Sequence, residues 1–323
     1  MTAFEQNGRE RVTYFVMQSM HPAPPPTANA PEPMNFIRAD HLGMCFGVRD
    51  AIQLACEHAR QAPLTVLGDL VHNETVLRDL RARGVEIVQK PAEAATRQVM
   101  ITAHGASEKA IAQARALGLE VIEATCPLVR LAHRAVLKLA REHYHPVIIG
   151  KRDHVEVRGL TGDLETFDVV LTEADVAGLA ERPRFGVIAQ TTQPIERVRR
   201  LAALIRQRFP AAEVRLVDTV CQPTKQRQHA ALELAQRADV VIVIGGAHSN
   251  NTRELVATCA QCCARVHHVQ TADDLALEWL EGARTVGITA GTSTPDEVIE
   301  AVERRLARMA AELSLRPTAA PSL

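Results

Sequence analysis

Short apolar runs rich in β-branched residues alternate with amphipathic helical patterns along most of this chain. Six such runs span residues 64–68, 99–103, 146–150, 185–189, 240–246 and 285–291. Alternating strands and helices are typical of α/β folds, in which helices connect parallel strands. Because the runs are apolar throughout, we expect sheets that are covered on both faces. The predicted fold class is therefore α/β.

Polar clusters follow these runs, where strands lead into helices, and they recur at long intervals. The recurring sets are Cys45, Cys126 and Cys221, separated by 81 and 95 residues; His72, His154 and His248, separated by 82 and 94; and His104, Thr191 and Ser293, separated by 87 and 102. Open α/β sheets bind ligands outside the carboxyl ends of their strands. The spacing predicts three similar α/β domains in a pseudo-threefold arrangement, with all clusters facing one central cavity.

Three of the seven cysteines lie in similar turns. Cys45 is in a glycine-rich turn, whereas Cys126 and Cys221 are each followed closely by proline. Glycine lets the backbone approach a bulky ligand, and proline stiffens a turn. Three converging thiolates would hold a [4Fe–4S] cluster and leave one iron free to bind substrate. Packing of free cysteines in the core and a three-cysteine zinc site are the alternatives.

The other cysteines are expected to pack rather than to bind metal. Cys259, Cys262 and Cys263 contain a C-x-x-C pair, but residues 253–266 predict one helix that holds all three. Cys56 also lies in a predicted helix.

Short polar side chains in the same turns form a candidate anion site. They are His72, His104, His154, Thr191, Ser249, Asn250, Asn251 and Ser293. Many open a helix, where free N–H groups and the helix dipole favour anions. These donors together predict a phosphate or diphosphate cage. The sequence contains neither a Walker A nor a Rossmann glycine motif, so ATP and a Rossmann dinucleotide are not indicated. Ordinary histidine pKa values of ~6.5 predict that affinity falls as the pH rises well above this value.

Glu156 is the candidate acid because it lies two residues after His154. In an extended segment, side chains at this spacing share a face, so Glu156 is expected to reach the same cavity and deliver protons. A solvated surface glutamate is the alternative interpretation.

Composition narrows the function classes. The 37 Lys+Arg and 38 Asp+Glu residues nearly balance, and only seven Phe, two Tyr and one Trp are present. This disfavours nucleic-acid binding. The sequence lacks an apolar stretch approaching the ~20 residues of a membrane span. Few cysteines and no secretory signal favour reduced thiols and a cytoplasmic protein.

The chain ends are predicted to be disordered and the middle to form three domains. Residues 21–33 contain six prolines, and the tail from residue 316 is similar in character. The predicted division is a disordered extension at 1–33, domains at 47–127, 128–217 and 218–308 plus 34–46, and a helix end and tail at 309–323.

The ordered motifs GMCFGV, LVHNETV, TAHGAS, EATCPLV, HVEV, AQTT, VCQPT, HSNNT and ITAGTSTPD resemble those of the LytB/IspH family of 4-hydroxy-3-methylbut-2-enyl diphosphate reductases. The resemblance runs in order from about residue 34 to about residue 308 and departs from the family pattern at Phe46, Val155 and Asn250. It implies a monomeric trefoil of three α/β domains around a [4Fe–4S] cluster, whose open iron can be lost in air to leave [3Fe–4S].

The resemblance also implies residue roles and a reaction. Cys45, Cys126 and Cys221 would be cluster ligands; His72, His104, His154, Ser249, Asn250, Asn251 and Ser293 would contact the diphosphate and substrate; Thr191 would lie near the substrate hydroxyl, and Glu156 would deliver protons. The implied reaction is the two-electron reductive dehydroxylation of an allylic diphosphate to isopentenyl and dimethylallyl diphosphates, the last step of the non-mevalonate (MEP/DOXP) pathway. Ferredoxin or flavodoxin would supply the electrons. A redox-neutral Fe–S hydro-lyase and a non-enzymatic Fe–S sensor are the alternatives.

Overall fold

The computed structural model describes residues 33–315. The predicted disordered extension, up to residue 32, and the predicted tail from residue 316 lie outside the described residues. Within 33–315, no helix combines the length and apolar character needed to cross a membrane.

The strands form three four-stranded sheets, and every pairing is parallel. In spatial order, the sheets are β3 (Glu86–Val88), β2 (Leu64–Leu67), β4 (Gln98–Ile101) and β5 (Glu120–Glu123); β7 (Asp168–Val170), β6 (His145–Ile149), β8 (Arg184–Ala189) and β9 (Glu213–Leu216); and β11 (Val266–Val269), β10 (Val240–Ile244), β12 (Thr285–Ala290) and β1 (Asn35–Arg38).

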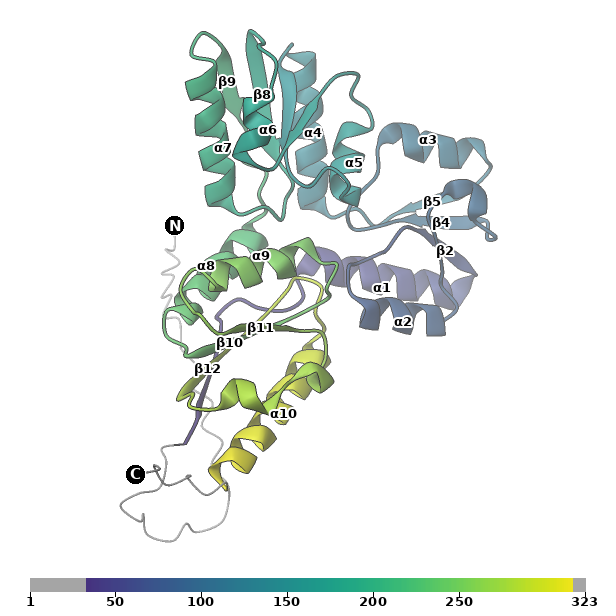
Figure 1. The fold of residues 1–323 in the computed structure, drawn as a ribbon. Coiled ribbons are helices and arrows are strands. Elements are labelled where there is room, and N and C mark those ends of the chain that lie inside the picture. Colours follow the sequence, from purple (N-terminus) through teal and green to yellow (C-terminus); the bar gives the residue numbers. More distant parts are fainter. Residues whose placement is uncertain (1–32, 316–323) are drawn as a thin grey trace, which may run out of the picture.

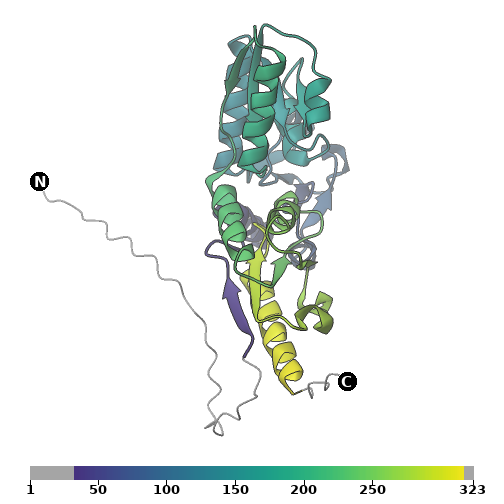
Figure 2. The ribbon, with the colours of Figure 1, turned by 60° about the vertical axis from the view of Figure 1, so that its left-hand side comes forward.

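The three sheets share one topology. In each, the second strand lies at an edge, followed by the first and the third. The fourth place is taken by β5, by β9 and, in the last sheet, by β1 from the start of the described chain. Figure 2 shows β1 beside the elements of this C-terminal sheet. The last lobe is thus closed by a segment distant in sequence.

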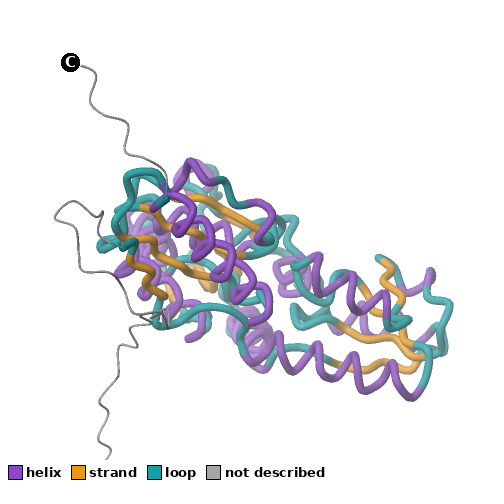
Figure 3. The backbone as a smooth tube through the Cα atoms, turned by 90° about the horizontal axis from the view of Figure 1, so that it is seen from below, coloured by secondary structure: helices purple, strands orange, loops and turns teal. Residues whose placement is uncertain are grey.

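Helices flank the strands, as Figures 1 and 3 show. They are α1 (Phe46–Gln61), α2 (Glu74–Ala82), α3 (Glu108–Ala116), α4 (Pro127–Arg141), α5 (Val155–Thr161), α6 (Glu173–Ala177), α7 (Ile195–Arg208), α8 (Gln222–Ala235), α9 (Asn250–Cys259) and α10 (Asp296–Ser314). Three short 3₁₀ helices complete the described elements at Pro91–Glu93, Ala272–Asp274 and Leu277–Leu280.

Strand β10 shows why the inner strands are apolar throughout. Its residues Val240, Ile242 and Ile244 pack in one cluster with apolar residues of α10. Val241 and Val243 point to the opposite face and pack with residues of α8 and α9. Successive strand side chains alternate between faces, so a strand covered by helices on both sides buries every residue.

These observations confirm the predicted α/β class and its threefold arrangement. Figure 1 shows three lobes that meet near the middle of the molecule. The predicted residue limits of the domains stay a prediction.

The prediction that residues 253–266 form a single helix is wrong. Helix α9 ends at Cys259, and the next residues form turns in which the amides of Cys262 and Cys263 both donate to the carbonyl of Cys259. The chain must reverse here to enter β11. Cys263 is buried and Cys262 is exposed.

Candidate functional site

Cys45, Cys126 and Cys221 occupy the same local position in the three lobes. Each is the N-cap residue of a helix, of α1, α4 and α8 respectively, and none caps its helix with a side-chain hydrogen bond. Their sulfur atoms therefore lie at the positive ends of three helix dipoles, an environment that favours thiolates.

Equivalent backbone hydrogen bonds fix the three cysteines to the sheets. Each cysteine amide donates, over 3.0 Å, to a carbonyl just beyond the end of the third strand of a sheet. The acceptors are Thr292 for Cys45, Ala103 for Cys126 and Thr191 for Cys221. The parallel strands β12, β4 and β8 thus deliver the three thiols to one region.

The charges of these thiols interact. Burial raises the pKa of Cys126, and the Cys45 thiol adds to this rise. Burial raises the pKa of Cys221 to about 11, with further contributions from Glu156 and Cys45. Cys126 and Cys221 are therefore protonated at neutral pH unless a positive group holds them as thiolates, which a bound metal centre does.

Gly47 allows the helix α1 to lie directly against Cys126. A Cβ atom added at Gly47 would lie 2.5 Å from Cys126 Sγ, so no other residue fits here without displacing the thiol. Three thiols at three helix N-termini, with this close approach, fit the ligand set of an iron–sulfur cluster.

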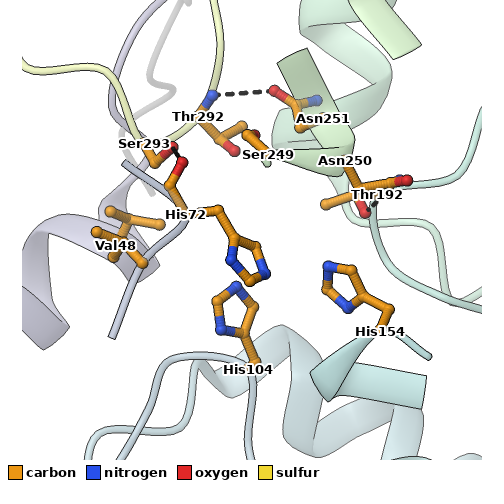
Figure 4. Close-up of a pocket in the computed structure, with 11 residues that line it drawn as sticks. Val48, His72, His104, His154, Thr192, Ser249, Asn250, Asn251, Thr292 and Ser293 are labelled. Atoms are coloured by element: carbon orange, nitrogen blue, oxygen red, sulfur yellow. Dashed lines mark hydrogen bonds between the residues drawn. The ribbon is translucent and has the colours of Figure 1, made fainter. Parts of the chain in front are cut away.

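Three histidines from three strand ends form a second group. His72 follows β2, His104 follows β4, and His154 is the N-cap of α5 after β6. Their ring centroids lie 4.4, 5.0 and 5.6 Å apart; the rings of His72 and His104 are stacked, and the ring of His154 is edge-on to both (Figure 4). Among the described residues, they also form a set with the spacing of metal ligands.

Burial keeps these histidines neutral in the free protein. It lowers the pKa of His72, lowers the pKa of His104 well below its ordinary value, and lowers the pKa of His154 to about 3. The expectation of ordinary values near 6.5 is therefore wrong. The Glu156 amide donates to His154 Nδ1 over 3.1 Å, so the neutral ring carries its proton on Nε2 and can donate from there.

A cavity lies beside the histidines (Figure 4); its empty space of about 320 Å³ includes the part that is open to solvent. Its lining residues are Val48, Val71, His72, His104, His154, Thr192, Ser249, Asn250, Asn251, Thr292 and Ser293. The polar groups of this lining are hydroxyls, amides and imidazoles, and none of the lining residues carries a carboxylate. Helix α9, capped by Ser249, directs its N-terminus to this wall and adds free backbone donors.

Several polar atoms of this wall lack a protein partner. His72 Nε2, His104 Nδ1 and Asn251 Nδ2 are buried and form no hydrogen bond within the described chain. The Thr292 amide donates to Asn251 Oδ1 over 2.9 Å, which leaves the Asn251 NH₂ group to face a ligand. A buried donor without an acceptor is costly, so the Asn251 NH₂ group favours an acceptor-rich ligand in this cavity.

Two cations extend the positive field around the cavity. Lys151 and Arg253 contribute to the lowered pKa of both His72 and His154, whereas Asp69 opposes this effect at His72. A divalent cation on the three histidines would face this positive field and the donor groups of the wall. An anion fits the surroundings better than a metal ion does.

Glu156 is buried, with 1% of its surface exposed, which rules out the solvated surface glutamate. The expected extended segment is also wrong, because Glu156 lies in the first turn of α5. The Thr191 amide donates to Glu156 Oε1 over 2.6 Å. Burial raises the pKa of Glu156 to about 7, although hydrogen bonds from Thr191 oppose the rise. The carboxyl is thus suited to hold and release a proton near neutral pH.

Thr191 connects the acid to the cysteine group. Its amide donates to Glu156, and its carbonyl accepts from the amide of Cys221. Its neighbour Thr192, rather than Thr191, lines the cavity and accepts a hydrogen bond from Asn250 Nδ2 over 3.2 Å. Val48 and Val71 also line the cavity and were not predicted, because apolar side chains give no sequence signal for an anion site.

A family model described as LytB protein matches residues 36–307. The chain belongs to the LytB protein family. Two of its relatives, both named 4-hydroxy-3-methylbut-2-enyl diphosphate reductase, are each 37% identical to it. The one from Pelobacter propionicus aligns over 276 residues, 84% of this chain and 98% of the relative. The one from Aquifex aeolicus aligns over 279 residues, 84% and 96% respectively.

Two solved structures resemble this LytB chain. The E-1-hydroxy-2-methyl-but-2-enyl-4-diphosphate reductase of Plasmodium falciparum aligns with a TM-score of 0.78 at 26% identity, covering 84% of this chain and 86% of that one. A structure of (E)-4-hydroxy-3-methyl-but-2-enyl diphosphate reductase, described as the terminal enzyme of the non-mevalonate pathway, aligns with a TM-score of 0.62 at 37% identity, covering 84% and 99%. The family membership predicted from the motifs is confirmed.

Burial of Glu156 should make the stability of the fold depend on pH. Because burial raises the pKa of Glu156 from 4.5 to about 7, the folded LytB chain loses stability relative to the unfolded chain as the pH rises through this interval. The full loss is about 3 kcal/mol at ~1.4 kcal/mol per pKa unit. Glu156→Gln keeps an acceptor for the Thr191 amide but cannot ionise. The variant is therefore expected to gain stability over the wild type between pH 5 and pH 8.

Urea unfolding of the metal-free proteins at both pH values measures this difference. Glu165→Gln, at an exposed glutamate between α5 and β7, is the matched control and should show no such gain. An equal response of the wild type and Glu156→Gln to pH would contradict the prediction.

Proposed function

We propose that this chain catalyses the reductive dehydroxylation of (E)-4-hydroxy-3-methylbut-2-enyl diphosphate to isopentenyl and dimethylallyl diphosphates. The observation that carries the proposal is that Thr191 connects two sites. Glu156 lies between the anion cavity and the three cysteines, and Thr191 hydrogen-bonds both to this acid and to Cys221. The names of the relatives in the family support the same reaction.

Cys45, Cys126 and Cys221 would hold a [4Fe–4S] cluster through three thiolates. When bound, such a cluster supplies electrons one at a time and an iron without a thiolate ligand that acts as a Lewis acid. The helix N-termini and Gly47 hold the three thiols in place for this ligand.

The diphosphate would lie in the cavity beside the histidines. His72, His104, His154, Ser249, Asn250, Asn251 and Ser293 would donate to or contact its oxygens. Hydrogen bonds to charged groups contribute about 1.5–3 kcal/mol each, so roughly six give a gross gain that exceeds the ~8 kcal/mol of micromolar binding. Part of this gain offsets the cost of ordering the ligand.

Glu156 would deliver the proton that turns the allylic hydroxyl into a leaving water. Because burial raises its pKa to about 7, a large fraction of the carboxyl is protonated at neutral pH. Thr191 holds this carboxyl through a backbone hydrogen bond and orients it. The C–O bond breaks as the oxygen leaves in water, and two electrons and a second proton complete either alkene product.

The remaining assignments concern partners and location. We propose a small one-electron carrier, a ferredoxin or a flavodoxin, as the electron donor, because the sequence has no Rossmann fingerprint for a nicotinamide cofactor. We also propose a monomer in the reducing cytoplasm, where cysteine ligands stay unoxidised. A cluster that loses its open iron in air would be found as [3Fe–4S].

An anaerobic assay with the allylic diphosphate tests the reaction. The iron-loaded protein is expected to form both alkene diphosphates with reduced viologen and neither without it, because the reaction consumes two electrons. Turnover without reductant would instead identify a redox-neutral hydro-lyase. No binding of the allylic diphosphate in calorimetry would favour an iron–sulfur sensor.

Glu156→Gln separates proton delivery from binding. Its turnover is expected to fall by roughly 10²–10⁴-fold, the usual contribution of a positioned acid, whereas its affinity for the substrate should change little. Steady-state rates and calorimetry measure the two quantities. An equal loss of affinity would instead show a structural role for Glu156.

Cysteine variants test the ligand set. Cys126→Ser is expected to lose most of the bound iron and the brown colour of the cluster, because a serine hydroxyl is a much poorer ligand than a thiolate for iron–sulfur centres. Cys262→Ser changes an exposed thiol outside the trio and should keep both. Iron analysis and visible absorption report the result, and the reverse pattern would show that Cys262 rather than Cys126 is a ligand.

A further inference from the structure

Arg227 is a buried cation beside the cysteine group. It lies on α8, six residues after Cys221, with 8% of its surface exposed. Its Nε and Nη2 atoms both donate to the carbonyl of Gly43, over 3.0 and 2.8 Å, and its Nη1 atom donates to the carbonyl of Pro223 over 3.1 Å. The guanidinium thus connects the Cys221 helix to the turn that carries Cys45.

No carboxylate balances this charge. Across residues 33–315, Arg227 forms no ion pair. The charged groups that favour its protonated form are the Cys45 and Cys221 thiols, whereas burial lowers its pKa. An arginine side chain stays protonated in proteins, and a buried charge without a counter-charge is costly.

We propose that Arg227 is a positioning residue that balances the negative charge of the cysteine-bound cluster and so favours its reduced state. The proposal rests on the proposed function, since it needs a metal centre on Cys45 and Cys221. Three thiolates make such a centre anionic, and each electron that enters adds negative charge. A fixed cation nearby therefore stabilises the reduced form more than the oxidised form and raises the reduction potential.

Arg227 also fixes the loop before α1. Its two hydrogen bonds to the Gly43 carbonyl hold a turn in which Gly43 has a φ of 73°, a conformation that favours glycine. Cys45 lies two residues further along. Charge and loop anchoring are separable, because lysine keeps the charge without the planar fork of donors, whereas methionine removes both at similar length.

The test compares reduction potentials of the iron-loaded protein. Wild type, Arg227→Lys, Arg227→Met and the control Arg237→Met, at an exposed arginine just after the same helix, are titrated with dithionite under EPR. Arg227→Met is expected to shift the equilibrium at least tenfold towards the oxidised cluster, which equals 59 mV for a one-electron couple. Arg227→Lys should lie much nearer to wild type, and Arg237→Met should match it.

A wild-type potential in Arg227→Met would overturn the proposal while leaving the proposed function intact, whereas a wild-type chain that binds no iron would overturn both. If Arg227→Met binds too little cluster for a redox titration, the thermal stability of its metal-free and iron-loaded forms tests the proposal instead. Removing the cation should stabilise the metal-free chain and destabilise the iron-loaded chain relative to Arg227→Lys. A change of the same sign in both forms would mean that Arg227 acts only as a structural anchor.

Discussion

The site depends on one repeated backbone interaction, the hydrogen bond from each cysteine amide to a carbonyl beyond the third strand of a sheet. Parallel strands end at a common edge, so this bond brings each helix N-terminus to the same level as the strand ends. Because the three sheets share one topology, the same bond occurs three times. The repeated bond therefore places one thiol at the strand ends of each sheet. In the last sheet β1 pairs with β12, and the turn after β1 carries Cys45 to its place as the third thiol.

The site concentrates groups that weaken the fold. Within residues 33–315, Glu156 is buried without a cation and Arg227 is buried without a carboxylate. One buried ring nitrogen of His72 and one of His104 also have no hydrogen-bond partner there. Each is unfavourable in the ligand-free protein. The large apolar clusters around the inner strands supply the stability that offsets these groups. A bound anion and an anionic metal centre would satisfy the unpaired donors and Arg227.

Sequence patterns predicted those parts of the fold that rest on local chemistry. The six inner strands are continuous apolar runs because helices cover both of their faces, and the motifs around Cys45, Cys126 and Cys221 carried the family resemblance that the comparisons confirmed. The outer strands escaped notice since they are short and half-exposed, as in β9. The lowered pKa of His154 depends on its burial and on His72 from another lobe, which a single sequence does not display. The helical start after His154 was also missed. Arg227 lacked any local signal, because its partner Gly43 is 184 residues away.

The neutral histidines and the buried acid of the cavity respond differently to an anion. His154 accepts the amide of Glu156 on Nδ1, so cage and acid share one helix turn. An anion that enters the cavity raises the pKa of each titratable group nearby. Histidines with lowered pKa values would take up at most part of that effect, whereas the same rise would favour the protonated form of Glu156, whose pKa already lies near 7. Arrival of the diphosphate would therefore load the acid before the chemical step, and departure of the product would return it to its ionising state.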